Sequence, residues 1–300
     1  MEAPLARSHA RLTWSPAPLP TDRAAARPGA AVSARAGVTL HWLGQAGFLL
    51  ESASLRILID PYLSDSLAIK YKGAAHPHVR MCPSPADPAA LRGIDIVLAT
   101  HGHTDHLDPA TIGPIAAANP DCLFVVPASC VDKALERGVP RGRLVEANAF
   151  AALDVAGLAV HPIPAAHEEL AIDDRGRLVC LGYVLELGGV LVYHPGDCAP
   201  YPGFADNLAP YAVDLALLPV NGRDAVRAAS GVPGNFSLEE AVGLTESAGF
   251  GAAIGHHFGM FDFNTIDEAH ARRFLAGRDG RASQPPFLLA DPGLRYEVTP

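Results

Sequence analysis

The stretch IDIVLATHGHTDHLD, residues 94–108, decides the fold. Its first half is short, apolar and rich in β-branched residues, which predicts a buried strand. Its second half places His101, His103, Asp105 and His106 at the carboxyl end of that strand, where open α/β folds commonly hold their chemistry. In extended backbone His101 and His103 point the same way, whereas Asp105 and His106 come after the chain has begun to turn. This arrangement suits two adjacent cations and predicts a dinuclear metal hydrolase.

Composition limits the classes of protein that fit. The chain has 300 residues, of which 49% are hydrophobic and 18% charged, so it can bury a sizeable core in one large domain or two ordinary ones. Acidic residues outnumber basic ones by 32 to 23, and the formal net charge is -9. This balance argues against a nucleic-acid partner, which normally needs a basic face, and against anionic membrane surfaces. We therefore expect a small-molecule substrate and neither a nucleic-acid nor a membrane partner.

The amino-terminal segment differs from the rest of the chain. Residues 1–36 are rich in Ala, Arg and Pro, which predicts a largely irregular extension, with Trp14 as an anchor onto the domain or onto a partner subunit. The globular hydrolase domain is expected over residues 37–300. No apolar stretch is long enough to span a membrane, the first residues lack a secretory signal, and the five cysteines form no C-x-x-C pair. These features favour a cytoplasmic protein with free thiols.

The order of the expected elements predicts sheets with outer helices. Strands at residues 38–43, 47–51 and 55–59 follow one another closely and should form an antiparallel meander. Further strands are expected at 94–100, 123–126, 144–147, 152–155, 158–163, 178–187, 190–193, 215–220 and 251–255, and helices at 109–118, 129–137, 237–248 and 267–275. The proline-rich region 62–88 is predicted to be a long irregular loop, and loops of that length are commonly functional lids.

Further metal-capable residues follow other expected strands, namely His167, Asp197 and the pair His256-His257. Strand ends of one sheet converge on one edge, so these residues could meet the first cluster in space. His161 competes with His167, but it alternates within a strand and is better explained as a satisfied sheet residue. His256 and His257 point to opposite faces of a strand, so the residues alone leave that choice open. A set of nitrogen and carboxylate ligands suits Zn, Mn or Fe rather than Cu(I).

Together these motifs resemble the metallo-β-lactamase superfamily. The H-x-H-x-D-H cluster and the downstream His167, Asp197 and His257 carry the resemblance. Within the superfamily, the chain is similar to the branch around the ascorbate-6-phosphate lactonase in WLGQAGF (42–48), IDPYLSD (59–65), YHPGD (193–197), PVNGR (219–223), GN (234–235) and HFGMF (257–261). These matches span residues 38–265. The resemblance implies an α/β fold, the four-layer αββα sandwich, with two mixed sheets face to face.

The resemblance also implies a role for each metal-capable residue, with two divalent ions (zinc or manganese, with iron as a further choice) as cofactors. The implied ligands are, for one ion, His101, His103 and His167, for the second ion, Asp105, His106 and His257, and for both ions, Asp197. Asp105 and Asp197 would also take part in catalysis, and Asp60 would orient ligand histidines from outside the ligand set. Cys198 departs from the family, which has Ser or Thr after the bridging aspartate, and we interpret it as a silent substitution.

Substrate contacts are predicted from the polar residues Asn221, Arg223 and Asn235. Arg223 is suited to clamp a phosphate or carboxylate bidentately, and a surface salt bridge is the alternative. The favoured function is hydrolysis of a lactone or ester of a small, anionic, sugar-type substrate by a hydroxide that two metal ions activate. A phosphodiesterase, either phospholipase D-like or acting on cyclic phosphates, is the alternative on the same site. A metal-binding protein without turnover is a third interpretation, and a homo-oligomer is compatible with each of them.

Overall fold

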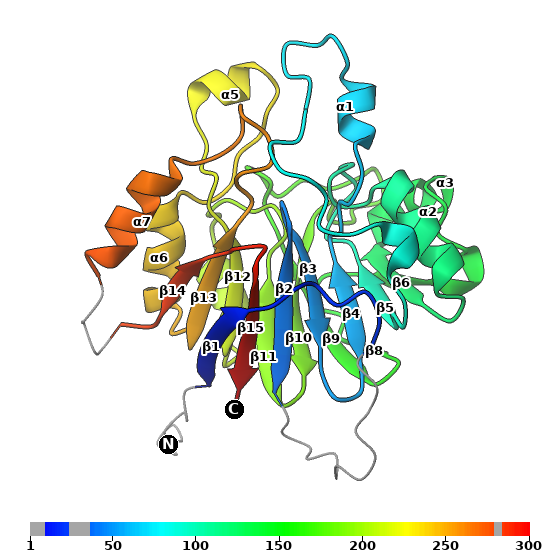
Figure 1. Ribbon diagram of the computed structural model, residues 1–300, viewed down its shortest axis with the longest axis horizontal. Helices are drawn as coiled ribbons and strands as arrows, with labels where there is room; N and C mark the ends of the chain where they lie inside the picture. The colour runs from blue at the N-terminus through cyan, green and yellow to red at the C-terminus, as the bar shows by residue number, and fades with distance from the viewer. Residues whose placement is uncertain (1–9, 24–36, 279–283) are drawn as a thin grey trace.

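Two mixed β-sheets pack face to face between outer helices, which confirms the four-layer αββα sandwich (Figure 1). The computed structural model describes residues 10–23, 37–278 and 284–300. The first sheet has the strand order β1-β15-β2-β3-β4-β5-β6-β7. Its strands are β1 (Arg11–Pro16), β2 (Val38–Gly44), β3 (Gly47–Glu51), β4 (Arg56–Ile59), β5 (Ile96–Leu98), β6 (Leu123–Pro127), β7 (Leu144–Ala147) and β15 (Leu294–Thr299).

The second sheet has the strand order β14-β13-β12-β11-β10-β9-β8. Its strands are β8 (Leu153–Val155), β9 (Leu158–Pro164), β10 (Leu181–Leu187), β11 (Val190–His194), β12 (Leu215–Pro219), β13 (Ala252–His256) and β14 (Phe287–Leu289). The predicted meander is the β2-β3-β4 segment of the first sheet, and both of its pairings are antiparallel.

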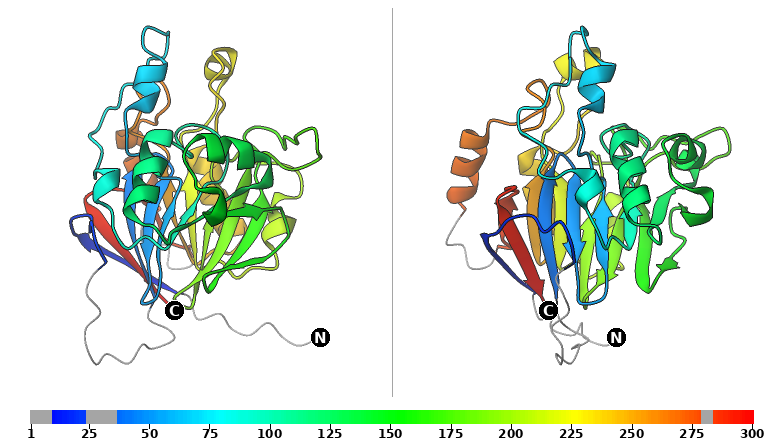
Figure 2. Two further views of the ribbon diagram at one scale, coloured as in Figure 1. Left: turned by 90° about the vertical axis from the view of Figure 1, so that its right-hand side faces the viewer. Right: turned by 45° about the vertical axis from the view of Figure 1, so that its right-hand side comes forward.

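Helices cover the outer faces of both sheets. The α-helices of the described residues are α1 (Ser66–Lys70), α2 (Pro109–Ala118), α3 (Val131–Glu136), α4 (Phe204–Leu208), α5 (Ala225–Ala229), α6 (Leu238–Ser247) and α7 (Glu268–Ala276), and those that cover the sheets are α2, α3, α4, α6 and α7. α2 and α3 share a core cluster with β4, β5 and β6 of the first sheet. On the second sheet, α6 packs on β12 and β13, α4 on β9, and α7 beside β14. Figure 2 shows that α1 and α5 instead project beyond one edge of the sheets.

The central strands are apolar on both faces because both faces are covered. Successive side chains of a strand point to opposite sides. In β4, Ile57 and Ile59 enter the large core that also contains the strands of the second sheet, whereas Leu58 enters the core beneath α2 and α3. A strand buried on both faces needs a continuous apolar run rather than an alternating one. This explains why β4 and β5 appear in the sequence as short uninterrupted apolar stretches.

Parallel pairing brings the ends of distant strands to one edge. β4, β5, β6 and β7 pair in parallel in the first sheet. β11, β12, β13 and β14 do the same in the second sheet. The loops that follow β5, β9, β11 and β13 therefore collect at one shared edge, and α1 and α5 stand above that edge (Figure 2).

The prediction of an irregular amino-terminal extension is wrong for residues 11–16. β1 pairs antiparallel with β15 along its whole length, with Trp14 opposite Tyr296. An edge strand of this kind is held by backbone hydrogen bonds to an open sheet edge, so it needs no strong apolar alternation in its own sequence. Trp14 itself stays 51% exposed. The domain thus begins before residue 37, and the prediction for residues 1–9 and 24–36 lies outside the described residues.

Smaller differences concern segments beside the shared edge. The region 62–88, predicted as an irregular lid, contains the helix α1, and the strand expected at 94–100 shortens to β5. All five cysteines are free, as expected. Among the described residues, none of the helices has the length and apolar character needed to cross a membrane.

Candidate metal centre

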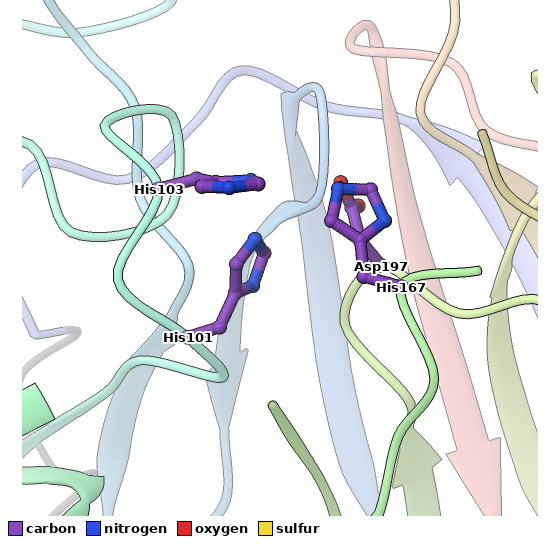
Figure 3. A group of neighbouring side chains, drawn as sticks. All are labelled: His101, His103, His167 and Asp197. Atoms are coloured by element: carbon purple, nitrogen blue, oxygen red, sulfur yellow. The ribbon is translucent and has the colours of Figure 1, made fainter. Parts of the chain in front are cut away.

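Four side chains from three loops face one another at the shared edge. The candidate ligand atoms of His101, His103, His167 and Asp197 all lie within 4.8 Å of one another. His101 and His103 come from the loop after β5, His167 follows β9, and Asp197 follows β11. In Figure 3 the two histidines of the first loop lie on one side and His167 with Asp197 on the other. The loop after β5 is bent rather than extended as predicted, yet the rings of His101 and His103 still meet edge to face at 4.6 Å.

A second group lies beside the first. The candidate ligand atoms of Asp105, His106 and His257 also lie within 4.8 Å of one another. His257 directly follows β13 and has a φ of 65°, a left-handed conformation that a histidine adopts only when its surroundings impose it. Its backbone N–H donates a hydrogen bond of 3.0 Å to the carbonyl of Gln45. This turn takes His257 out of the strand direction and into the group.

Asp197 lies between the two groups and presents one carboxylate oxygen to each. Oδ1 lies 3.3 Å from Nε2 of His106 and 2.9 Å from Nε2 of His257. Oδ2 lies 3.5 Å from Nε2 of His167. The Asp197 residue is 4% exposed. A buried carboxylate with one oxygen toward each ligand group has the geometry of a bridge between adjacent cations.

Asp60 supports the ligand loop from the sheet. It directly follows β4, and its Oδ1 accepts a hydrogen bond of 2.8 Å from the N–H of Thr100. Its Oδ2 accepts a hydrogen bond of 2.6 Å from the Thr100 hydroxyl and lies 2.7 Å from Nδ1 of His106. A carboxylate at Nδ1 fixes the ring angle of a histidine and leaves Nε2 to face the metal. The resemblance implied an outer position of this kind for Asp60.

Burial and charge shift the pKa values of the centre in opposite directions. Burial lowers the pKa of His101 well below its ordinary value and that of His167 to about 4, which keeps both imidazoles neutral. Burial also disfavours a charge on His106, but Asp197 and two neighbouring carboxylates outweigh it and raise the pKa of His106 well above its ordinary value. Burial disfavours ionisation of Asp197, yet His257 and His106 hold its pKa well below the ordinary value. Asp197 is therefore an ionised carboxylate placed to attract cations.

The donor atoms fit divalent metal ions. Nε2 of His101 is buried and forms no hydrogen bond with any residue that the structure describes. Nε2 of His106 and Oδ1 of Asp197 are also buried, and their close polar contacts among the described residues are to other candidate ligands. Leaving a buried polar group unsatisfied costs about 1–3 kcal/mol. Imidazole nitrogen and carboxylate oxygen are ligands that zinc, manganese and iron accept. Cations held between these atoms would satisfy them, so the residues suit the metals that the sequence predicts.

Gln45 belongs to the centre, although the motif analysis did not single it out. It lies in the turn between β2 and β3 and has a φ of 49°. Its Nε2 donates a hydrogen bond of 2.9 Å to Oδ2 of Asp105 and lies 3.2 Å from Nε2 of His257. The local sequence carried no signal for this role, because a polar residue in a turn between two strands is the ordinary case. That turn lies at the shared edge, so Gln45 reaches both residues of the second group.

The competing histidines lie outside both ligand groups. His161 stays in β9, with its ring 5.2 Å from the Tyr211 ring. His256 is buried and stacks on His194 at 5.0 Å. Cys198, beside Asp197, is also buried, and burial raises the pKa of its thiol to about 12, so it remains protonated. The structure therefore brings together the same ligand set that the resemblance implied.

Arg223 forms the salt bridge that was the alternative to substrate binding. Its Nη1 and Nη2 donate to the two carboxylate oxygens of Glu240 at 2.6 and 2.7 Å, and Glu240 also completes the capping box of α6. Asn235 and Asn221 are buried in a chain of amides, in which Asn235 Nδ2 donates to Asn221 Oδ1 and Asn221 Nδ2 donates to Asn264 Oδ1. Asn264 lines the cavity above the centre, whereas the buried Asn221 and Asn235 do not line it and are joined to it only through Asn264.

A cavity of about 550 Å³ opens above the two ligand groups. One of its walls is aromatic and combines the region 62–88 with the loop after β13. Tyr71 stacks on His78 with the ring centres 4.3 Å apart, and Phe261 stacks on Phe263 with the ring centres 5.9 Å apart. The volume and the mixture of apolar wall and polar floor are those of a small-molecule site. The region 62–88 thus lies where a lid over the substrate would lie.

Comparison with known proteins identifies the family. The model described as "Beta-lactamase superfamily domain" matches residues 55–258, which is more than half of the chain. The chain belongs to the metallo-β-lactamase superfamily. A "UPF0173 metal-dependent hydrolase" of Aeropyrum pernix is 31% identical to this superfamily member over 209 residues, which cover 64% of this chain and 76% of the relative. One of Methanopyrus kandleri is 29% identical over 263 residues, covering 86% and 99%. This superfamily member is a metal-dependent hydrolase.

Other similar proteins agree with the branch that the motifs predicted. The Escherichia coli protein named "Probable L-ascorbate-6-phosphate lactonase UlaG" is 30% identical over 214 residues, covering 59% of this chain and only 58% of that protein. Among solved structures, an isothiocyanate hydrolase from Delia radicum gut bacteria has a TM-score of 0.67 at 19% identity, covering 86% of this chain and 98% of that one. The metallo hydrolase Igni18 of Ignicoccus hospitalis has a TM-score of 0.61 at 22% identity, covering 85% and 96%. At these identities the structures support the superfamily fold alone.

Proposed function

We propose that this metal-dependent hydrolase holds two divalent ions and opens a lactone or a related ester of a small, anionic, sugar-type substrate. The observation that carries the proposal is the position of Asp197, with one oxygen toward each ligand group. When two such ions are bound, they lower the pKa of water and polarise the ester carbonyl, so no serine or cysteine nucleophile is needed. Zinc and manganese are the first choices and iron a further one, because the ligands are nitrogen and carboxylate oxygen.

The chain's own residues supply positioning and exclusion of water. Asp60 orients His106 through Nδ1, and Gln45 holds the Asp105 carboxylate through Oδ2. The aromatic wall of the cavity offers a surface on which a substrate ring can pack while its ester faces the ligand groups. The lactone is favoured over other esters by the 30% identity to a protein named as a lactonase, which extends over 58% of that protein.

The proposal is tested first by metal content. The purified protein, loaded with manganese or zinc and then desalted, is expected to retain about two ions per chain, as a two-metal site requires. Less than one ion per chain after careful loading would rule out a site that holds two metal ions. The loaded protein is then assayed on sugar lactones and, in parallel, on bis-aryl phosphodiesters. Hydrolysis of phosphodiesters without lactone opening would replace the proposed reaction by the phosphodiesterase, and turnover of neither class would favour a non-catalytic metal protein.

Replacing the Asp197 carboxylate tests its role in metal binding in a protein that is still folded. Asp197→Ala is expected to lose at least one ion per chain and all measurable turnover, because both ligand groups lose a donor. Asp197→Asn keeps the side-chain volume and should show the same loss if the charge is what matters. Asp206→Ala, an exposed carboxylate on α4, is the matched control and should retain metal and activity. Full activity in a folded Asp197→Ala protein, verified by circular dichroism, would contradict the bridging assignment.

A further inference from the structure

Two cations from one helix line the cavity beside the metal centre. Lys133 lies in α3, and Arg137 directly follows the last residue of that helix. The two are four residues apart, and the N–H of Arg137 bonds to the carbonyl of Lys133 at 3.1 Å, so they project from the same side of the helix. Both line the cavity. Like charges at this spacing repel each other, so the pair needs an explanation.

Lys133 is held against the metal-ligand loop without a partner for its charge. A Cβ built on Gly102 would lie 2.9 Å from Cδ of Lys133 and 3.0 Å from its Nζ, so the ammonium lies directly over the residue between His101 and His103. The ammonium of Lys133 forms no hydrogen bond or ion pair with any residue that the structure describes. Several partly exposed arginines elsewhere do have a carboxylate partner, such as Arg223 with Glu240. An unpaired ammonium beside a catalytic centre is therefore a candidate contact for a ligand.

Arg137 fixes the same loop but its charge is not neutralised by a carboxylate. Its Nη1 donates to the carbonyl of His103 at 3.2 Å and to that of Leu107 at 2.7 Å. Its Nη2 lies 3.5 Å from Oγ1 of Thr104, which also lines the cavity. Carbonyl oxygens satisfy guanidinium hydrogens but carry no formal charge. Lys133, Arg137 and the Thr104 hydroxyl thus form one polar patch on the ligand loop.

The charge distribution of the cavity favours an anion at this patch. Among the described residues that line the cavity, the carboxylates are Asp105 and Asp197, and both are metal-ligand candidates. Their charge is committed to the metal centre, whereas that of Lys133 is not. Lys70 also lines the cavity, but its Nζ lies 4.9 Å from the centre of the Tyr71 ring, at the aromatic wall. The α3 patch is therefore the cationic side of the cavity and the aromatic wall its apolar side.

We propose that Lys133, Arg137 and Thr104 form a subsite that binds the anionic group of the substrate, with Lys133 as its main contact. The anionic group is a phosphate or a carboxylate, and the ester of the same substrate faces the metal centre. This assignment replaces Arg223, whose charge Glu240 already neutralises. It rests on the proposed function only for where the scissile bond lies. The anion contact itself is a binding event that is measured without turnover.

Binding of a sugar acid phosphate tests the subsite directly. Calorimetric titration of the metal-free protein with 6-phosphogluconate and with gluconate is expected to show tighter binding of the phosphate ester. Lys133→Met keeps the length of the side chain and should weaken 6-phosphogluconate by roughly tenfold to a hundredfold, the range for hydrogen bonds to charged groups, while Lys133→Arg should restore most of the affinity. Lys72→Met, an exposed lysine outside the cavity lining, is the matched control and should bind as the parent does.

Kinetics on the metal-loaded protein distinguish phosphate from carboxylate. Neutral gluconolactone, its 6-phosphate and the carboxylate-bearing saccharolactone are compared in parent and Lys133→Met. KM is expected to rise about tenfold for the anionic lactone that the subsite accepts, with kcat and the neutral lactone nearly unchanged. Equal affinity of parent and Lys133→Met for 6-phosphogluconate, or no binding by the parent, would overturn the subsite. Failure to hydrolyse any lactone would instead count against the proposed function and leaves the binding result to judge the subsite.

Discussion

Asp60 illustrates how a single residue can act on the candidate metal centre through another residue, His106. Its carboxylate contacts Thr100 and Nδ1 of His106 rather than the cavity, and it is fully buried. Three short hydrogen bonds converge on it, so its charge is shared between the backbone, a hydroxyl and an imidazole. The position of the His106 ring, and hence the direction of its Nε2, depends on this arrangement.

We expect Asp60→Asn to weaken metal binding while the ligands themselves remain. An amide cannot accept from both the Thr100 hydroxyl and the His106 ring with full charge, so the ring loses its fixed orientation. The metal dissociation constant, measured by competition with a chromogenic chelator, should rise roughly 10–100-fold. Asp206→Asn on α4 is the control. An unchanged dissociation constant in the folded Asp60→Asn protein would show that Asp60 stabilises the sheet edge and not the centre.

His257 and His256 show what the residues alone could determine. Adjacent strand residues point to opposite faces, so spacing left both as ligand candidates, and only the family resemblance favoured His257. The structure supplies the physical reason, since a φ of 65° turns His257 toward the centre while His256 stays in β13 and stacks on His194. Gln45 was missed for a related reason. A single polar residue in a turn acquires a role only from the distant residues that it meets.

β1 is a strand that the sequence analysis did not predict. It lies at the exposed edge of the first sheet and is joined to β15 by backbone pairing. The segment after it is fixed as well, because the buried guanidinium of Arg56 donates hydrogen bonds to the carbonyls of Pro20 and Thr21. Neither contact leaves a mark in local apolar periodicity. The central strands were predicted well because a strand that is buried on both faces requires a continuous apolar run in the sequence.

Truncation tests the contribution of this element. Removal of residues 1–23 exposes the edge of β15 and removes two acceptors of Arg56, the carbonyls of Pro20 and Thr21, while Arg92 and Glu51 remain as its partners. We therefore expect a lower urea midpoint and a loss of about 2–4 kcal/mol from the lost hydrogen bonds and strand pairing. Metal content should be retained, since none of the described residues 10–23 is a candidate metal ligand. Removal of residues 1–9 alone is the control. Equal midpoints for both truncated proteins would show that β1 adds no stability.

At the scale of the whole molecule, the candidate metal ligands come from both sheets, so bound ions would join the sheets. His101, His103, Asp105 and His106 come from the first sheet, whereas His167, Asp197 and His257 come from the second. The residues predicted the layers and the meeting of these side chains after the strand ends, whereas the resemblance implied which of them are ligands. Neither predicted the cavity walls or the position of Lys133, because these depend on how loops far apart in the chain pack together.

Removal of metal should therefore weaken the whole fold. An ion that binds only the folded chain stabilises it by about 4 kcal/mol per site at a thousandfold excess over its dissociation constant. We expect chelation to lower the thermal midpoint by several degrees and readdition of metal to restore it, as measured by scanning calorimetry. Asp197→Ala should show the lower midpoint with or without added metal. A parent protein whose midpoint does not respond to chelation would indicate that the sheets hold the centre without help from the ions.

The spread of the ligands along the chain has a consequence for how the protein is made. The loop with His101 and His103 leaves the ribosome long before His257 does, so a growing chain carries an incomplete chelating loop. Its companions His167, Asp197 and His257 follow only after β9, β11 and β13 in turn. Tight metal retention is thus a late event in biogenesis. A chain that stops short of β13 would lack His257, one of the candidate ligands.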